Sequence, residues 1–341
     1  MRVAMYYNNR DIRLEEMPTP AIGPGEILMR VRASGICGSD LMEWYRLPKA
    51  PLVLGHEVSG EVVETGEGVD KFRPGDRVIA THHVPCNTCY HCLRGNHSAC
   101  RTLRTTHFDP GGFSEYIRIP AINVDRGVLR LPDEVSHDEA SFVEPLGCVV
   151  RGHTLAGFRV SDSVLVMGSG ITGLLHIQLA RALGAGRIIA TDISGFRLGA
   201  ASRFGADHTV GAGEEVASYL RNVNEGRLAD IVIVCTGARQ AIEDSFSLVD
   251  PGGTILFFAP SSPEAELRIP YNEFWWSGIK TVSSYAASPS DLATALELIR
   301  AKRVNVAGMV THRLALKETR EGFRMVEEAG DSIKVIIDPG L

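Results

Sequence analysis

Four cysteines lie within fifteen positions of this sequence, in the pattern C-x2-C-x2-C-x7-C, and they are Cys86, Cys89, Cys92 and Cys100. Thiolates suit zinc, and four of them complete its tetrahedral shell, so the segment 86–100 is predicted to hold a structural zinc. The polar residues between the cysteines build no core, so the metal must supply the order. An iron–sulfur cluster, which is also held by sets of four cysteines, is the alternative.

Cys37, His56 and Glu57 form a second group of residue types that bind zinc. Adjacent residues on an extended chain point to opposite sides. His56 and Glu57 can therefore face one metal only where the backbone bends, and Gly55 could supply the bend. Each residue alone also fits an ordinary structural role, such as a buried small thiol or a hydrogen-bonded imidazole.

A glycine-rich turn of the form G-x-G-x-x-G follows a short apolar run at 164–166. An Ala-rich apolar segment at 174–183 then predicts a helix. The first glycine allows a tight turn, the second lets the backbone approach a pyrophosphate, and the third lets helix and strand pack closely. The predicted dinucleotide-phosphate contacts are Gly168, Gly170, Ile171, Thr172 and Gly173.

An acid stands at the end of the next predicted strand, 187–190. Asp192 can accept hydrogen bonds from the adenosine ribose and would repel a 2′-phosphate, which favours NAD over NADP. Arg197 lies within reach of the same ribose and would tolerate some NADP. Two further predicted strands, 229–234 and 254–258, end beside candidate neighbours of the nicotinamide. The other predicted cofactor contacts are Thr236, Phe258, Ala259 and Ser284.

The composition is that of an ordinary globular protein, with 341 residues, 44% hydrophobic and 22% charged. A net charge of -6 argues against nucleic acid or an anionic membrane as the main partner. The first residues hold no apolar core of a signal peptide, and no apolar run reaches the length of a membrane span. Seven cysteines, four of them crowded together, favour metal binding in a reducing cytoplasm over a disulfide framework.

The elements that must position these residues begin with a β-rich region. Alternating residues at 26–32, 58–65 and 76–80 predict strands separated by glycine turns. Ser136 with Glu139 three residues later predicts the capped start of a helix.

These residues together make the chain resemble the zinc-containing medium-chain dehydrogenases, the group of alcohol, sorbitol and threonine dehydrogenases. The matching segments occur in the family's order and are 37–40, 55–57, 66–69, 74–78, 86–100, 111–116, 144–146 and 168–192. The resemblance implies an α/β protein with a GroES-like β-barrel catalytic domain and a doubly wound (Rossmann) NAD-binding domain. It implies a catalytic domain at 1–150, a dinucleotide-binding domain at 151–285, and a return segment at 286–341 that completes the catalytic domain.

The resemblance also implies a catalytic zinc on Cys37 and His56. Glu57 is implied as a third ligand or near neighbour, and Glu144 as a carboxylate that binds the zinc directly or through its water. A carboxylate amid the apolar residues around Glu144 would be costly to bury without such a partner. Which of the two glutamates binds zinc at rest stays open.

Proton transfer is implied for Ser39, whose hydroxyl matches the group that touches the substrate oxygen. Asp40 matches the acid that orients the ligand histidine. The family often has a histidine three residues after the serine, but this chain has Met42. The proton must leave by another route, through ribose hydroxyls and water or through Glu43.

The substrate pocket is expected to include Trp44, His107, Phe108 and Tyr285. Sorbitol dehydrogenases have an arginine where Ser284 stands, which weakens a sorbitol assignment. In similar proteins a strand near the aromatic run 274–276 pairs between subunits, which implies a homodimer or homotetramer; packing within the chain explains the run equally well.

The predicted activity is reversible oxidation of a secondary alcohol, polyol or amino alcohol to the ketone, with NAD as hydride acceptor and two zinc ions per chain. An NADP-linked carbonyl reductase is the alternative enzyme, favoured by Arg197 and opposed by Asp192. A regulatory or structural protein that only binds the cofactor is the non-enzyme alternative. It would be expected to lack the catalytic ligands and to hold one zinc.

Overall fold

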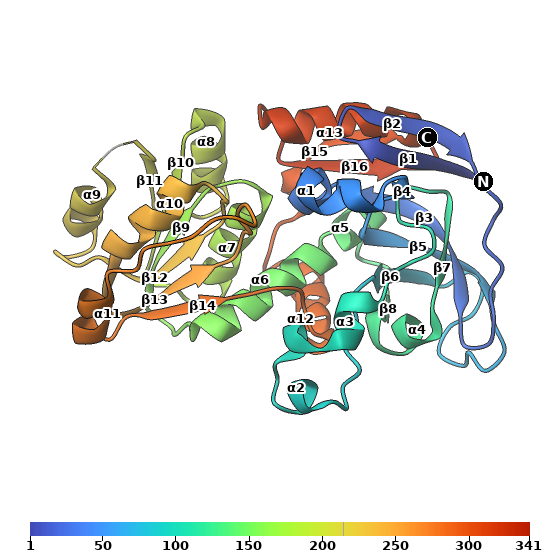
Figure 1. Ribbon diagram of the computed structural model, residues 1–341, viewed down its shortest axis with the longest axis horizontal. Coiled ribbons are helices and arrows are strands. Elements are labelled where there is room, and N and C mark those ends of the chain that lie inside the picture. The colour runs from blue at the N-terminus through green and yellow to red at the C-terminus, as the bar shows by residue number, and fades with distance from the viewer. Residues whose placement is uncertain (214) are drawn as a thin grey trace. The chain divides into compact units, whose positions relative to one another are not determined.

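The computed structural model describes residues 1–213 and 215–341 (Figure 1). The chain divides into two compact units. The first unit consists of Met1–Gly147, Ala287–Lys302 and Val306–Leu341, and the second of Cys148–Ala286 and Arg303–Asn305. No helix in the described part of the chain is both long and apolar enough to cross a membrane.

The first unit is built on a seven-stranded sheet in the order β15-β16-β3-β5-β6-β8, with β7 paired to β3. Its strands are β3 (Ile27–Gly35), β5 (Glu57–Thr65), β6 (Arg77–Thr81), β7 (Tyr116–Ile119), β8 (Val128–Arg130), β15 (Val310–Ala315) and β16 (Lys334–Asp338). A smaller sheet holds β2 (Asp11–Glu16), β1 (Arg2–Asn8) and β4 (Leu52–Val53). The C-terminal strands, red in Figure 1, therefore share a sheet with strands from the first hundred residues.

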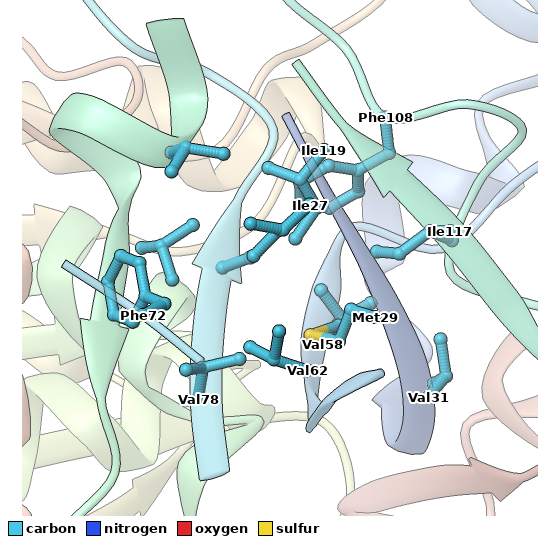
Figure 2. Packing of buried hydrophobic residues seen from close by; sticks show 13 residues of the cluster. Ile27, Met29, Val31, Val58, Val62, Phe72, Val78, Phe108, Ile117 and Ile119 are labelled. Carbon is cyan, nitrogen blue, oxygen red and sulfur yellow. The ribbon is translucent and has the colours of Figure 1, made fainter. Parts of the chain in front are cut away.

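Alternation of apolar side chains along these strands produces the core of the first unit. Figure 2 shows Met29 of β3 beside Val58 and Val62 of β5, with Ile117 and Ile119 contributed by β7. The predicted strands 26–32, 58–65 and 76–80 are confirmed within one to three residues at their ends. The capping box is also confirmed, since Ser136 and Glu139 cap α5 reciprocally.

Short helices and two longer ones, α12 (Pro289–Arg300) and α13 (Thr319–Glu328), complete the first unit. The short helices are α1 (Glu43–Arg46), α2 (Tyr90–Leu93), α3 (Arg101–Thr105), α4 (Ala121–Gly127) and α5 (His137–Ala140). The 3₁₀ helices are η1 (Gly38–Leu41), η2 (Leu47–Lys49), η3 (His97–Ala99), η5 (Ala307–Met309) and η6 (Leu316–Glu318). The boundary between the units falls inside α6 (Val143–Ala156).

The second unit is a parallel six-stranded sheet in the order β11-β10-β9-β12-β13-β14. In order along the sheet, its strands are β11 (His208–Gly211), β10 (Arg187–Asp192), β9 (Ser163–Met167), β12 (Ala229–Val234), β13 (Val249–Phe257) and β14 (Lys280–Ser283). Its helices are α7 (Ile171–Ala182), α8 (Gly195–Arg203), α9 (Val216–Val223), α10 (Arg239–Asp244) and α11 (Tyr271–Ser277), with the 3₁₀ helix η4 (Ser245–Ser247). Numbered within this unit the strand order is 3-2-1-4-5-6, the doubly wound order, so the predicted Rossmann fold is confirmed.

Candidate active site and metal centres

The four crowded cysteines converge on one point. Sulfur–sulfur distances are 3.9 Å for Cys86–Cys92, 3.5 Å for Cys89–Cys92 and 3.7 Å for Cys86–Cys100. Four sulfurs bound at about 2.3 Å to a tetrahedral zinc lie about 3.8 Å from one another. The donor set and its spacing therefore fit zinc, and all of the chain's cysteines are free of disulfides.

The thiols of this lobe differ in their pKa values. Hydrogen bonds from Thr88 lower the pKa of Cys86 to about 5, whereas burial raises the pKa of Cys92 to about 12. A divalent ion among the sulfurs would deprotonate all four thiols. The four thiols could therefore hold a divalent cation.

The second group is formed by Cys37, His56 and Glu57, whose ligand atoms all lie within 4.8 Å of one another. Cys37 follows β3 and caps η1, and Glu57 begins β5. Gly55 has a φ of 95°, and a Cβ there would lie 2.7 Å from the backbone nitrogen of Phe113. The bend before His56 therefore requires glycine, and it lets two neighbouring residues contribute to one group.

Asp40 fixes the orientation of His56. Its fully buried carboxylate lies 3.3 Å from His56 Nδ1 and accepts a hydrogen bond from Cys37 N at 3.1 Å. Burial alone would raise the pKa of Asp40, but His56, Arg46 and the Cys37 N–H outweigh it and leave that pKa lowered. An ionised Asp40 holds Nδ1 of the imidazole, which leaves Nε2 for a metal.

The Ser39 hydroxyl lies beside the group formed by Cys37, His56 and Glu57. Its Oγ donates to Cys37 Sγ at 3.4 Å and accepts from Arg46 Nη2 at 3.4 Å. A hydroxyl in contact with a metal-binding sulfur can reach a substrate oxygen bound beside that sulfur.

Glu57 has a partner that the sequence analysis did not identify. Its carboxylate forms a buried ion pair with Lys334 of β16. Lys334 Nζ also donates to Ile36 O at 3.2 Å and lies 5.5 Å from the ring centroid of Phe142. A lysine directly before a run of buried apolar residues was the available signal.

Glu144 lies in the first turn of α6 and is half-buried. In the part of the chain that the structure describes, Glu144 is not a member of the metal-binding group formed by Cys37, His56 and Glu57.

The glycine turn joins β9 to α7. Gly168 has a φ of 93°, and a Cβ on Gly173 would lie 1.9 Å from Gly168 O, so both positions require glycine. Helix α7 begins at Ile171, three residues earlier than the predicted 174, which places Ile171 and Thr172 in its first turn. The free N–H groups of that turn can bind a pyrophosphate.

Asp192 and Arg197 flank this turn. Asp192 accepts hydrogen bonds from Ser169 N at 2.7 Å and Ser194 N at 2.9 Å, and is 6% exposed. The Arg197 guanidinium lies 3.7 Å from the Cβ position of Gly170. Its buried Nε has no hydrogen-bond partner among the described residues. The Arg197 guanidinium is therefore able to bind an anionic group beside the glycine turn.

The remaining predicted cofactor contacts lie where their strands end. Thr236 follows β12, Phe258 and Ala259 follow β13, and Ser284 follows β14. The N–H groups of Phe258 and Ala259 both donate to Val234 O, at 3.1 and 3.2 Å. Strands β9 and β12 are neighbours at the point where the strand order reverses, which is where such sheets bind ligands.

Two family models match this chain. The alcohol dehydrogenase GroES-like domain matches residues 23–133, and the zinc-binding dehydrogenase domain matches residues 172–301. Sorbitol dehydrogenase of Gallus gallus is 32% identical over 339 residues, which cover 96% of this chain and 93% of that protein. L-Threonine 3-dehydrogenase of Chelativorans sp. (strain BNC1) is 33% identical over 336 residues, which cover 95% of this chain and 94% of that protein.

The chain belongs to the zinc-containing medium-chain dehydrogenase family. The fold agrees, since galactitol-1-phosphate dehydrogenase from Escherichia coli superposes with a TM-score of 0.89 at 28% identity, covering 99% of this chain and 100% of that one. The predicted combination of a GroES-like domain with a Rossmann domain is confirmed, and this dehydrogenase is an oxidoreductase of the zinc-dependent class.

The predicted pocket residues of this dehydrogenase lie in different surroundings. Trp44 is 50% exposed and Tyr285 is 51% exposed, whereas Phe108 is buried in the core of Figure 2. His107 is exposed and belongs to a group of histidines.

That group includes His82 and His83, which the sequence analysis missed. They follow the end of β6, and the His82 ring lies 4.8 Å from the ring of His56 and 3.7 Å from that of His83. The His83 ring lies 5.7 Å from the ring of His107. Two consecutive histidines directly after a predicted strand were the available signal.

Proposed function

We propose that this dehydrogenase catalyses the reversible oxidation of a secondary alcohol, a polyol or an amino alcohol, to the corresponding ketone with NAD. The observation that carries the proposal is the convergence of Cys37, His56 and Glu57, with the Ser39 hydroxyl 3.4 Å from the Cys37 sulfur. Relatives named sorbitol, threonine and galactitol-1-phosphate dehydrogenase support the substrate class.

The proposed metal content is two zinc ions per chain. Cys37 and His56 would hold the catalytic one, with Glu57 or Glu144 completing the set, and the four-cysteine lobe would hold the structural one. A bound zinc supplies a Lewis acid for the alcohol oxygen, and NAD supplies an acceptor for the hydride.

The chain's own residues would orient the reactants and move the proton. Asp40 holds His56 in one orientation through the 3.3 Å contact at Nδ1. Ser39 Oγ would accept the proton of the substrate hydroxyl and release it to water or to the ribose hydroxyls, because Met42 offers no relay. Lys334 neutralises Glu57, which keeps a buried carboxylate beside the ligands without an unpaired charge.

The proposed nucleotide is NAD. Asp192 would bind the ribose hydroxyls and repel a 2′-phosphate. An NADP-linked carbonyl reductase is the second candidate, because Arg197 lies beside the glycine turn with its Nε unpartnered among the described residues. Steady-state rates with NAD and NADP decide between them: a higher kcat/KM with NADP would support the second candidate.

We also propose a homo-oligomer in the cytoplasm. In helix α11, Phe274 packs inward, 5.5 Å from the ring of Phe246, whereas Trp275 and Trp276 are 64% and 77% exposed beside the edge strand β14. A second copy would bury these indoles, and free zinc-binding thiols suit a reducing compartment. Native mass spectrometry would show a dimer or tetramer, and a Trp276→Asp variant would shift it toward monomer.

The experiment that tests the activity is NADH formation by zinc-loaded protein with sorbitol, 2,3-butanediol and threonine, repeated with Cys37→Ser. We expect turnover of one substrate class that Cys37→Ser abolishes. Equal turnover by Cys37→Ser would contradict the proposal.

A further inference from the structure

Besides Lys334, five side chains that carry a positive charge or an imidazole are linked by contacts to Ser39 or to His56, and none of them is a predicted metal ligand. Together they are called the basic ring: Arg46, Lys49, His82, His83 and His107. The whole chain has a net charge of -6, so a local accumulation of basic groups does not follow from its composition.

Arg46 provides one side of the basic ring. Its Nη2 lies 3.4 Å from Ser39 Oγ and its Nε donates to Ser39 O at 3.1 Å. The guanidinium also lies 3.4 Å from Asp40 Oδ1, and the side chain is only 14% exposed. These contacts fix a permanent charge next to the hydroxyl that is proposed to contact the substrate.

Lys49 lies next to Arg46 across an aromatic ring. Its ammonium lies 3.6 Å from the ring centroid of Tyr45, and the Arg46 guanidinium carbon lies 4.9 Å from the same centroid. Tyr45 therefore holds two cations near each other by cation–π contacts. Lys49 itself is exposed, and its ammonium can bind a further anion.

The histidines provide the other side. The His82 ring is tilted against that of His56, with centroids 4.8 Å apart, and its buried Nδ1 has no hydrogen-bond partner among the described residues. Burial, then Lys49 and then Arg46 lower the pKa of His107. Both charges that act on this imidazole are positive, so the space it borders has a positive potential.

Two acids of this region, Glu57 and Asp40, already have basic partners. Glu57 is paired with Lys334, and Asp40 is in contact with both His56 and Arg46. In the part of the chain that the structure describes, Lys49 has a cation–π contact with Tyr45 but no ion pair, so an anionic ligand could pair with its charge.

We propose that the alcohol oxidised by this dehydrogenase carries an acidic group, a carboxylate or a phosphate, that binds to Lys49 and Arg46 while its hydroxyl lies at Ser39. His82 and His107 would offer imidazole hydrogen bonds to the same substrate. This inference rests on the proposed function, and it narrows the substrate class to hydroxy acids or polyol phosphates.

Matched substrate pairs test the selectivity. The pairs are 3-hydroxybutanoate with 2-butanol, for a carboxylate, and sorbitol 6-phosphate with sorbitol, for a phosphate. We expect the acidic member of one pair to have a kcat/KM at least about tenfold above its neutral partner, since a charge-assisted hydrogen bond contributes that much. Lys49→Gln should reduce the ratio of kcat/KM between the acidic and the neutral member of that pair by about tenfold. The control is Lys71→Gln, which removes the same charge from a lysine that is 60% exposed and paired with Asp125.

A binding measurement does not depend on turnover. Titration calorimetry of zinc-loaded protein with acetate and with inorganic phosphate should show one anion binding about tenfold more weakly to Lys49→Gln than to Lys71→Gln. Equal binding by both variants, or equal kcat/KM within both substrate pairs, would overturn the inference and leave the dehydrogenase assignment intact. Lys49-dependent anion binding without oxidation of any alcohol would instead contradict the proposed function.

Discussion

Replacing Lys334 by methionine should strongly destabilise the first unit. The side chains of Lys334 and Glu57 are 0% and 1% exposed, so the substitution leaves a carboxylate buried without its counter-ion. Breaking a buried ion pair in this way costs about 3–5 kcal/mol in the free energy of unfolding. Glu57→Gln combined with Lys334→Met removes the stranded charge and should recover most of that loss.

A matched control is available in the same unit. Lys302 forms an ion pair with Glu139 at 2.7 Å, but the lysine is 60% exposed. Lys302→Met should therefore cost less than about 1 kcal/mol, because solvent screens an exposed pair.

The stability of the first unit must be measured separately from that of the second, because a chain of two units need not unfold in one step. Hydrogen exchange of the amides in β3 and β16 reports the opening free energy of the sheet that holds both residues. Equal protection of these amides in Lys334→Met and Lys302→Met would refute the reasoning. A double variant as unstable as Lys334→Met would refute the attribution to an uncompensated charge.

Three further predictions follow from other parts of the chain. Gly173→Ala should abolish NADH binding, measured by fluorescence titration, because its Cβ would lie 1.9 Å from a backbone oxygen; Gly199→Ala, in α8 with open space around it, should bind normally. Cys100→Ser should lower the zinc content by about one ion per chain in plasma emission spectrometry, whereas Cys235→Ser should not; an unchanged content would exclude the structural zinc. Burial lowers the pKa of His153 to about 4 from its ordinary 6.5, so the unfolded chain binds the proton first as the pH falls. His153 alone should therefore cost the second unit about 3 kcal/mol between pH 6.5 and 4, in addition to the contribution of the stacked His176, whose pKa is also lowered by burial. The His153→Phe variant should lose correspondingly less than the unmodified protein in urea unfolding at the two pH values; an identical pH dependence would contradict this assignment.

Features encoded by neighbouring residues were predictable from the sequence. The glycine turn at 168–173 and the capping box of Ser136 each depend on contacts within a few residues, and the structure has both. The start of α7 was placed three residues late, because the glycines of the turn concealed that Ile171 is already helical. The parallel pairing of β15 with β16 joins two segments of the last forty residues, and no pattern within either segment predicts it.

Contacts between distant segments could not be predicted in this way. Lys334 and Glu57 are 277 positions apart, and only the pairing of β16 with β3 brings that lysine to the metal-binding group. The same holds for His82, whose ring contact with His56 depends on the pairing of β5 with β6. A local pattern identifies which residues can do chemistry, whereas the sheet decides which of them meet.

The most direct test of the central claim is the fate of the hydrogen on the carbinol carbon. An alcohol found to be a substrate would be deuterated at that carbon, and the NADH formed by the zinc-loaded protein would be analysed by mass spectrometry. The account predicts one deuterium per NADH for the unmodified protein and no labelled product for Cys37→Ser. Unlabelled NADH, or labelled NADH formed equally well by Cys37→Ser, would contradict it.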